Sequence, residues 1–295
     1  MEKDVGMFGM TTTLRNRRDH YIPQGYLRGF IGPCNELAQK PLWVFDIPHQ
    51  AWSQKSTKEF AYKYGLYDYS EESPSDTIAV DVSFAGLEQH FPQVRNEISS
   101  DGFENWTTHK DFLLRFMDMM RLRSLLALDQ MRRVANATRM FEIEKVLEPS
   151  PDSSNSDRKF DTVKYKEKTF KDESEKQRLL KNLTLTEMRR ALERPAPWLS
   201  SLSWALRYTT DSNQPFVCSE HPLLVIGKET DVSSALSSPD TLIFFPVSWR
   251  ACLVGCLAQF EKETCEFHPE EVNRVRAIYR ENATLFVASP CKTAF

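Results

Sequence analysis

The chain has 295 residues, of which 41% are hydrophobic and 12% aromatic, with 10 glycines against 16 prolines. This composition excludes disordered, collagen-like and coiled-coil chains, and at about 100–200 residues per domain the length allows one large domain or two small ones. The 38 Lys and Arg residues against 41 Asp and Glu give a formal net charge of -3. A nucleic-acid contact must therefore come from a local basic patch.

No apolar stretch of signal-peptide length occurs near the first residue, and nowhere do about 18 uncharged apolar residues follow one another. We therefore expect a cytoplasmic protein without membrane contact. The six cysteines are sparse, which predicts reduced thiols. Cys252, Cys256, Cys265 and His268 have zinc-ligand chemistry, but they lack the C-x2-C spacing of most structural sites. Buried free thiols are the preferred interpretation, and no metal or cofactor is expected.

Residues 20–30, HYIPQGYLRGF, mix aromatic, apolar and polar types too densely for a loop. Pro23 forces Ile22 towards an extended conformation and can open a helix at its first turn. The pattern predicts an extended approach followed by a helical turn. Residues 41–46 then predict a short strand, and because both of its faces are apolar we expect it to be buried.

Helical spacing begins at residues 78–98, where apolar residues recur every three or four positions. Pro92 is expected to kink or split this helix. Thr108 followed by Asp111 resembles a capping box. The next ~40 residues, to Leu147, predict one very long helix or two helices broken near Asn136.

This long helix would carry the clearest basic patch of the chain. The spacing of Arg121, Arg132 and Arg139 brings them to one face, Arg133 lies beside them, and arginines so placed can bind phosphates. Nearby aspartates offer the alternative of a solvated face of paired charges.

Residues 149–178 are rich in Ser, Asp and Lys and predict a mobile polar insertion. A second capping pattern at Thr184–Glu187 predicts a helix that ends before Pro195. From about residue 204 short apolar runs indicate strands, and a last helix begins near Pro269.

We therefore predict a single α+β domain over residues 1–295. Its N- and C-terminal parts contribute a mixed or antiparallel sheet, and residues from about 78 to 195 form a central helical layer.

The first candidate site lies in the N-terminal cluster. A helical turn after Pro23 would bring Gln24 near His20, which gives a neutral imidazole a partner for proton transfer. Tyr21 and Tyr26 lie in the same cluster. The alternative is that His20 caps a helix or satisfies a buried backbone group.

A second candidate is Ser219-Glu220-His221-Pro222, which follows an apolar strand. Reactive side chains often lie where a strand ends in a turn. Adjacent residues of a strand face opposite ways, so an ordinary polar turn is the alternative. No zincin, P-loop, dinucleotide-binding or nucleophile-elbow motif occurs.

At these residues the chain resembles a family long catalogued only as a domain of unknown function, common in bacteria and fungi. Its hallmark is His-Tyr-x-Pro-Gln-x-Tyr-Leu-x-x-Phe, which residues 20–30 match. Further pieces agree in order along the chain: Asp46, Leu87 with Glu88, Arg123 with Ser124, residues 216–222, residues 245–247 and Asn273. One departure is Glu220, which stands where the family usually has Asp.

Fungal members of this family look like arginine-containing cyclodipeptide synthases, which join two aminoacyl-tRNAs into a diketopiperazine. The resemblance implies arginyl-tRNA and a second aminoacyl-tRNA as partners, with the arginine-rich helix binding tRNA. The resemblance implies that His20 is a proton shuttle oriented by Gln24 and Tyr26. It implies that Ser219 is an acyl acceptor and that Glu88 and Glu220 bind the guanidinium or activate the amine. Tyr21 and Arg123 would make further substrate contacts. An Asp-Asp-x-x-Glu element associated with those synthases is not intact here.

Two other functions remain open at this point. One is a metal-dependent nucleic-acid hydrolase of a defence type that uses His20 with the carboxylates. The other is a non-catalytic binding module in which the same side chains form a structural network.

Overall fold

The computed structural model describes residues 18–33, 39, 41–67, 80–125, 127–129, 133, 141–147, 161–167, 173–193, 196–227 and 238–292. Its helical elements are α1 (Gln24–Leu27), the 3-10 turn η2 (Arg28–Phe30), α2 (Val80–Ser100), the 3-10 turn η4 (Glu104–His109), α3 (Lys110–Arg123), α5 (Glu173–Ala191), α6 (Pro197–Ser201) and α8 (Pro269–Asn282). Among these described helices, none combines the length and the apolar composition that crossing a membrane requires.

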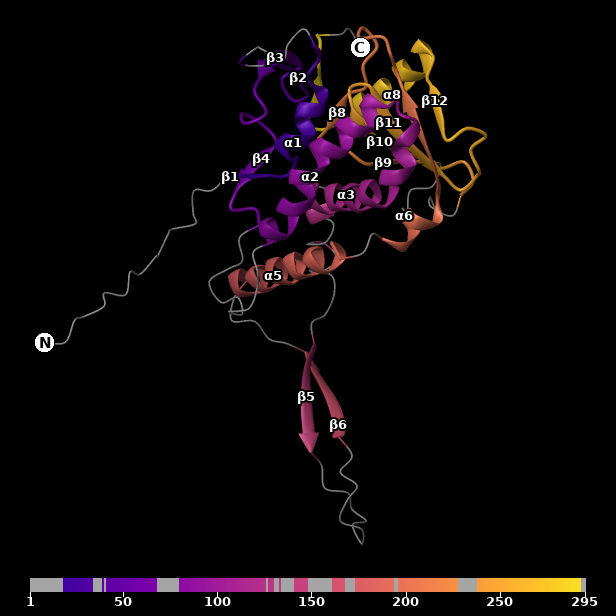
Figure 1. The fold of residues 1–295 in the computed structure, drawn as a ribbon. Helices are drawn as coiled ribbons and strands as arrows, with labels where there is room; N and C mark the ends of the chain where they lie inside the picture. The colour runs from indigo at the N-terminus through magenta and orange to yellow at the C-terminus, as the bar shows by residue number, and fades with distance from the viewer. Residues whose placement is uncertain are drawn as a thin grey trace, which may run out of the picture.

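The strands fall into two larger sheets and two ribbons (Figure 1). They are β1 (Arg18–His20), β2 (Leu42–Asp46), β3 (Ala51–Lys55), β4 (Tyr62–Tyr64), β5 (Phe141–Leu147), β6 (Asp161–Glu167), β7 (Ser203–Tyr208), β8 (Cys218–Ser219), β9 (Leu224–Ile226), β10 (Leu242–Ser248), β11 (Ala251–Cys256), β12 (Thr264–Glu266) and β13 (Phe286–Ser289). Helices and sheets together confirm the α+β class.

The four-stranded sheet joins the two ends of the described chain. Its strand order is β3-β2-β13-β8, and β2 pairs antiparallel with β13 so that Phe45 faces Val287. The sequence predicts a strand at residues 41–46 with apolar side chains on both faces, and Leu42, Val44 and Phe45 are indeed buried. The expectation that N- and C-terminal segments share a sheet is confirmed.

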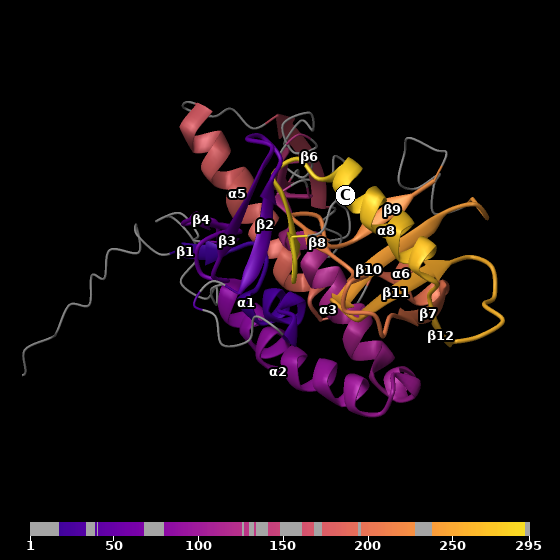
Figure 2. The same ribbon diagram turned by 90° about the horizontal axis from the view of Figure 1, so that it is seen from above.

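The five-stranded sheet has helices on both faces. Its order is β12-β7-β11-β10-β9, antiparallel apart from the parallel pair of β12 and β7. Phe245 of β10 belongs to the core that includes α2 and α3, whereas its neighbour Phe244 belongs to the core that includes Tyr279 of α8. Figures 1 and 2 show α8 on one side of these strands and the helices α2 and α3 on the other. Burial on both faces explains the unbroken apolar runs of β10 and β11.

The helical layer consists of α2, α3 and α5. Helix α2 is continuous through Pro92, so the proline does not split it. The Pro92 ring packs against α1, because a Cβ atom added at Gly25 would lie 3.3 Å from the Pro92 Cγ atom. Helix α5 begins at Glu173, so the start predicted at Thr184 is wrong, but the helix ends before Pro195 as expected.

The very long helix predicted up to Leu147 does not form. Helix α3 ends at Arg123, because Ser124 takes an extended conformation with φ -59 and ψ 143. Residues 141–147 instead form strand β5, which pairs antiparallel with β6. Alternation of apolar and charged residues holds only over the first four positions of FEIEKVL, and the antiparallel partner that completes the strand lies at residues 161–167.

The β5–β6 ribbon extends away from the two larger sheets (Figure 1). The register sets Glu142 opposite Lys166 and Glu144 opposite Lys164. Within the segment 149–178 the structure describes β6 and the beginning of α5, and the rest of that predicted insertion lies outside the described residues.

Candidate functional site

A pocket of about 490 Å³ opens where β1, α1 and α2 meet. It is lined by side chains from distant parts of the sequence: Arg18, Asp19, His20, Gln24, Gly25, Arg28, Tyr67, Ala85, Glu88, Gln89, Pro92 and Arg123. The volume lies within the range of small-molecule sites in proteins, roughly 300–1,000 Å³. Its lining is rich in charged and polar groups, which favours a polar ligand over an apolar one.

Arg123, the last residue of α3, connects three of the segments that form the pocket. It is 4% exposed. Its Nη1 donates to the Glu88 carboxylate, its Nη2 donates to the main-chain carbonyl of His20, and its Nε donates to the Tyr67 hydroxyl at 3.2 Å. The guanidinium carbon also lies 4.5 Å from the centre of the Phe84 ring. This network fixes β1 against α2 and α3.

The charge of Arg123 is compensated within this network. Burial alone would lower the pKa of the guanidinium, but Tyr67 and Glu88 outweigh that effect, and the pKa is raised. A buried ion that keeps its charge in this way needs all of its partners. One consequence concerns Glu88, which was expected to bind a substrate guanidinium. One of its carboxylate oxygens already accepts from the chain's own Arg123.

His20 lies half-buried beside Arg123 in the pocket. Its Nε2 atom is buried and has no hydrogen-bond partner among the described residues. Burial, together with the positive charge of Arg123, lowers the pKa of the imidazole. The ring is therefore neutral at pH 7, which is the form of an imidazole that can accept a proton.

The other residues of the N-terminal motif divide between the pocket and the core. Gln24 lines the pocket with His20, whereas Tyr21 and Tyr26 are not among its lining residues. Tyr26 is fully buried, and its hydroxyl donates to the Pro246 carbonyl at 2.6 Å. Tyr21 is 5% exposed, and burial, reinforced by the charge of Glu220, raises its pKa. Tyr26 thus lies in the hydrophobic core and has no place near the His20 ring.

Ser219 and Glu220 belong to a separate cluster, outside the residues that line the pocket. Both are fully buried. The Glu220 carboxylate accepts hydrogen bonds from the main-chain N–H groups of Thr284, Leu285 and Phe286 and from the Thr284 hydroxyl. It therefore anchors the start of β13 to the end of β8.

The Ser219 hydroxyl is occupied in a local turn. It accepts from the His221 N–H at 3.1 Å and lies 3.2 Å from the His221 carbonyl oxygen, to which it donates. The His221 imidazole lies 3.7 Å from the Glu220 carboxylate, and burial lowers its pKa. The second candidate cluster thus lies outside the lining of the pocket.

The four arginines of the predicted basic face do not all lie on one helix, because α3 ends at Arg123. Arg132 and Arg139 lie outside the described residues. Arg121 pairs at 2.7 Å with Asp118, whose second oxygen accepts from the Ala196 N–H. Arg133 is exposed and pairs at 2.7 Å with Asp129. Both described arginines of the set are thus bound to carboxylates of the same chain.

The described cysteines are free thiols. Cys252 is fully buried, and burial raises its pKa. The Cys256 thiol donates to the Ala258 carbonyl at 3.1 Å. In the described part of the chain, no three His, Cys, Asp or Glu side chains gather as metal ligands would.

Five polar residues of the pocket were not predicted as part of the site: Arg18, Asp19, Arg28, Tyr67 and Gln89. Asp19 is 3% exposed and accepts from the Tyr67 N–H at 3.2 Å. A signal for Arg18 was present, because it stands two residues before His20 and an extended segment brings both to one face. Tyr67 comes from a distant loop, and nothing in its local sequence marks it.

The comparison with curated proteins and the comparison with solved structures each give no match. A comparison with protein families matches residues 18–291 to "Protein of unknown function (DUF4238)". The matched span begins at β1 and includes β13, so it contains both larger sheets, the pocket and the Glu220 cluster. The chain therefore belongs to the DUF4238 family, in which no activity is assigned.

Proposed function

We propose that the protein is an aminoacyl-tRNA-dependent transferase that forms an arginine-containing cyclic dipeptide, with the pocket around His20 as its active site. The observation that carries the catalytic part is the His20 imidazole, which lines the pocket and whose lowered pKa keeps it in the neutral form that a general base needs. The substrate class rests on the resemblance of the chain, through residues 20–30, to a family whose fungal members look like arginine-containing cyclodipeptide synthases.

The chemistry requires two acyl transfers. In each, an amine attacks the carbonyl carbon of an aminoacyl ester, a C–N bond forms, and the ester C–O bond to the tRNA breaks. The proton lost by the amine must reach the leaving tRNA oxygen. A neutral imidazole accepts that proton and then returns it, so that it ends the step unchanged. His20 is the group of the pocket suited to this task.

The pocket residues around His20 support the same task. Arg123 donates to the His20 main-chain carbonyl and so fixes the position of the residue. Its positive charge also favours the neutral imidazole, which is the form a general base needs. Gln24 lines the pocket and carries both a donor and an acceptor, which allows it to orient a substrate amine or carbonyl.

The test is product formation by the purified protein. The full chain is incubated with tRNA charged with arginine and with mixed amino acids, and mass spectrometry detects cyclo-Arg-Xaa products. We expect product with the native chain, loss of product in His20→Ala, and normal product in the control His49→Ala, whose side chain is exposed on the turn after β2. If the folded native chain yields no cyclic dipeptide, the proposal is wrong. A binding module is then favoured, in which His20→Ala changes only stability.

A further inference from the structure

The β1–β4 ribbon presents four planar side chains on one face. Antiparallel pairing sets Arg18 opposite Tyr64 and His20 opposite Tyr62. Residues directly opposite each other, and residues two apart along a strand, share a face of the ribbon. The opposite face is attached to the body of the protein through the buried Asp19.

The four side chains contact one another as a continuous row. The His20 and Tyr62 ring centres are 5.6 Å apart, and the Tyr62 and Tyr64 rings meet edge to face at 5.7 Å. The Arg18 guanidinium lies 4.8 Å from the Tyr62 ring centre, and its Nε donates to the Tyr64 hydroxyl at 3.1 Å. We call these residues the ribbon row.

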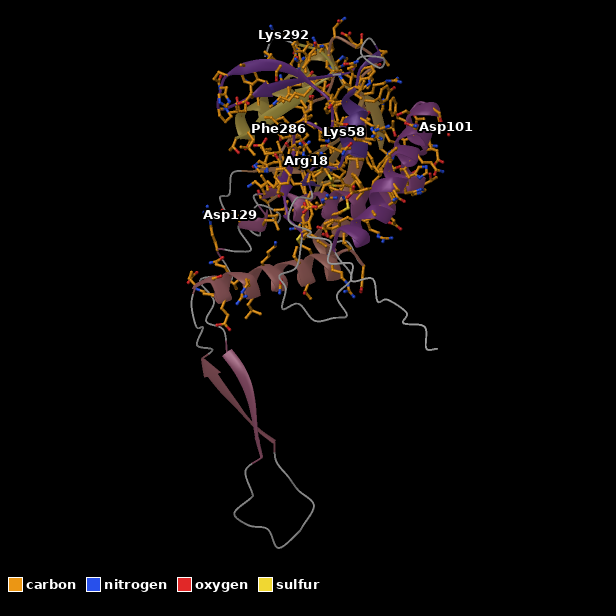
Figure 3. The ribbon with its side chains drawn as sticks, turned by 90° about the vertical axis from the view of Figure 1, so that its left-hand side faces the viewer. Arg18, Lys58, Asp101, Asp129, Phe286 and Lys292 are labelled. Atoms are coloured by element: carbon orange, nitrogen blue, oxygen red, sulfur yellow. The ribbon has the colours of Figure 1, made fainter. Side chains whose placement is uncertain are left out.

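The ribbon row runs from the solvent to the pocket. Tyr64, at its outer end, is 56% exposed and is one of the few large apolar side chains exposed in the described chain. His20, at its inner end, lines the pocket, as does Arg18. Figure 3 shows the side of the molecule on which Arg18 lies, with Asp129 apart from it towards α5. A ligand stacked on the row would therefore end beside the His20 imidazole.

The chemistry of the ribbon row matches single-stranded nucleic acid. Exposed aromatic rings and guanidinium planes are the surfaces on which unpaired bases stack, and positive charges beside them contact the phosphates. Arg18 supplies such a charge within the row, and Arg28 supplies another at the pocket. A folded duplex keeps its bases stacked internally and cannot use such a platform.

We infer that the ribbon row is a stacking platform for the single-stranded 3′ end of an RNA, which it leads into the His20 pocket. This inference rests on the proposed function, in which the reacting ester is carried at the 3′ end of a tRNA. It places the RNA contact on the ribbon and not on the arginines after α3.

The test is a binding titration of the full chain with fluorescently labelled RNA, followed by anisotropy. One probe is a short single strand ending in CCA, and the other is a blunt duplex of the same length. We expect tighter binding of the single strand. Tyr64→Leu keeps an apolar side chain but removes the ring, and it should weaken binding by at least about fivefold, the loss that corresponds to one base stack of about 1 kcal/mol.

Three further variants separate stacking from general charge. Tyr64→Phe retains the ring and should bind within about twofold of the native chain. Arg18→Gln should weaken binding and reduce its salt dependence, because a phosphate contact is lost. Arg274→Gln is the matched control, an exposed arginine of α8 outside both the row and the pocket lining, and should leave binding unchanged. Melting curves of every variant confirm that each is folded.

Equal affinity for duplex and single strand, or native affinity in Tyr64→Leu, would overturn the inference. Its failure is separable from that of the proposed function. If Tyr64→Leu forms cyclic dipeptide as well as the native chain does, the proposed synthase activity is retained and the stacking platform is refuted. If RNA binds through the row but no cyclic dipeptide forms, the stacking platform is retained and the proposed synthase activity is refuted.

Discussion

Glu220 offers the sharpest test of a structural against a catalytic role. The substitution Glu220→Gln is nearly isosteric, so it removes the charge of the carboxylate with little change in volume. In the native chain both oxygens accept, one from Thr284 and Leu285 and the other from the Phe286 N–H at 3.1 Å. All of the donors belong to the segment that leads into β13.

The expected cost follows from these four hydrogen bonds. A hydrogen bond to an ionised acceptor contributes about 1.5–3 kcal/mol, and a neutral one about 0.5–1.5 kcal/mol. Exchanging the charge for an amide therefore weakens three bonds by roughly 1 kcal/mol each and turns the fourth acceptor into a donor that faces an N–H group. Because Glu220 is fully buried, solvent does not screen the loss. We expect the free energy of unfolding to fall by about 4 kcal/mol.

The assay is urea unfolding at pH 7, with an unchanged m-value as the condition for comparing variants. The matched control is Glu266→Gln, because Glu266 is exposed and also accepts from a threonine, Thr210. We expect less than about 0.5 kcal/mol for this surface change. A Glu220→Gln variant as stable as the control, but without activity, would refute the structural interpretation and return Glu220 to the catalytic site.

Three further predictions concern the pocket and the packing. Arg123→Met leaves the partly exposed Glu88 carboxylate and the part-buried His20 carbonyl without their donor, so we expect the free energy of unfolding to fall by about 2–4 kcal/mol, and an unchanged melting temperature would contradict the network. The lowered pKa of His20 means that the unfolded chain binds more protons at and below pH 6.5. The stability that the neutral ring contributes is complete above about pH 6.5 and is lost progressively as the pH falls from there through the lowered pKa of the folded state. Urea unfolding at pH 7.5 and pH 5.5 measures this loss, which should be smaller in His20→Asn, and an equal loss in both chains would show that His20 does not cause it. Gly255→Ala would place a Cβ atom 2.7 Å from the Trp204 ring and should lower the free energy of unfolding by about 1–3 kcal/mol. Gly86→Ala on α2 adds a Cβ atom that meets nothing within 4 Å and should raise that free energy by up to about 1 kcal/mol. Similar melting temperatures for the two variants would refute this packing argument.

Local sequence patterns were sufficient to predict the strands that are buried on both faces. The strand at residues 41–46 and the apolar runs of β10 and β11 are predicted because both of their faces are buried, which leaves a continuous hydrophobic signal. The helix after Pro269 is predicted because proline fits the first helical turn, and His268 with Glu271 completes the cap.

The wrong predictions concern a charge-rich stretch whose sequence is compatible with both the helical period of 3.6 residues and the strand period of 2. Helix-forming residues continue beyond Arg123, and the charges there suit a solvated helix as well as a ribbon. Only the long-range pairing of β5 with β6 decides between them, and pairing partners about 20 residues apart are not visible in either segment alone. The early start of α5 at Glu173 was missed for a similar reason, because the local capping pattern at Thr184 does not begin the helix.

The candidate site could be predicted only in part. His20 and Gln24 are close in sequence, and a helical turn is sufficient to bring them together. Glu88 and Arg123 join them through the packing of α2 and α3, which no local motif records. Ser219 and Glu220 have reactive chemistry, but Ser219 is hydrogen-bonded within its own turn, and the donors to Glu220 come from residues more than 60 positions later.

The pairing of β2 with β13 has a consequence for how the protein is made. The paired residues Asp46 and Phe286 lie about 240 positions apart, so this contact closes a very long loop and forms late in folding. At about 5–20 residues per second, a ribosome takes on the order of tens of seconds to synthesise the intervening chain. Throughout that interval one edge of the β2–β3 hairpin has no partner strand, and an unpaired apolar strand edge is a site of misassembly. A nascent chain that stalls before Phe286 is therefore the form of this protein most exposed to aggregation and most in need of a chaperone.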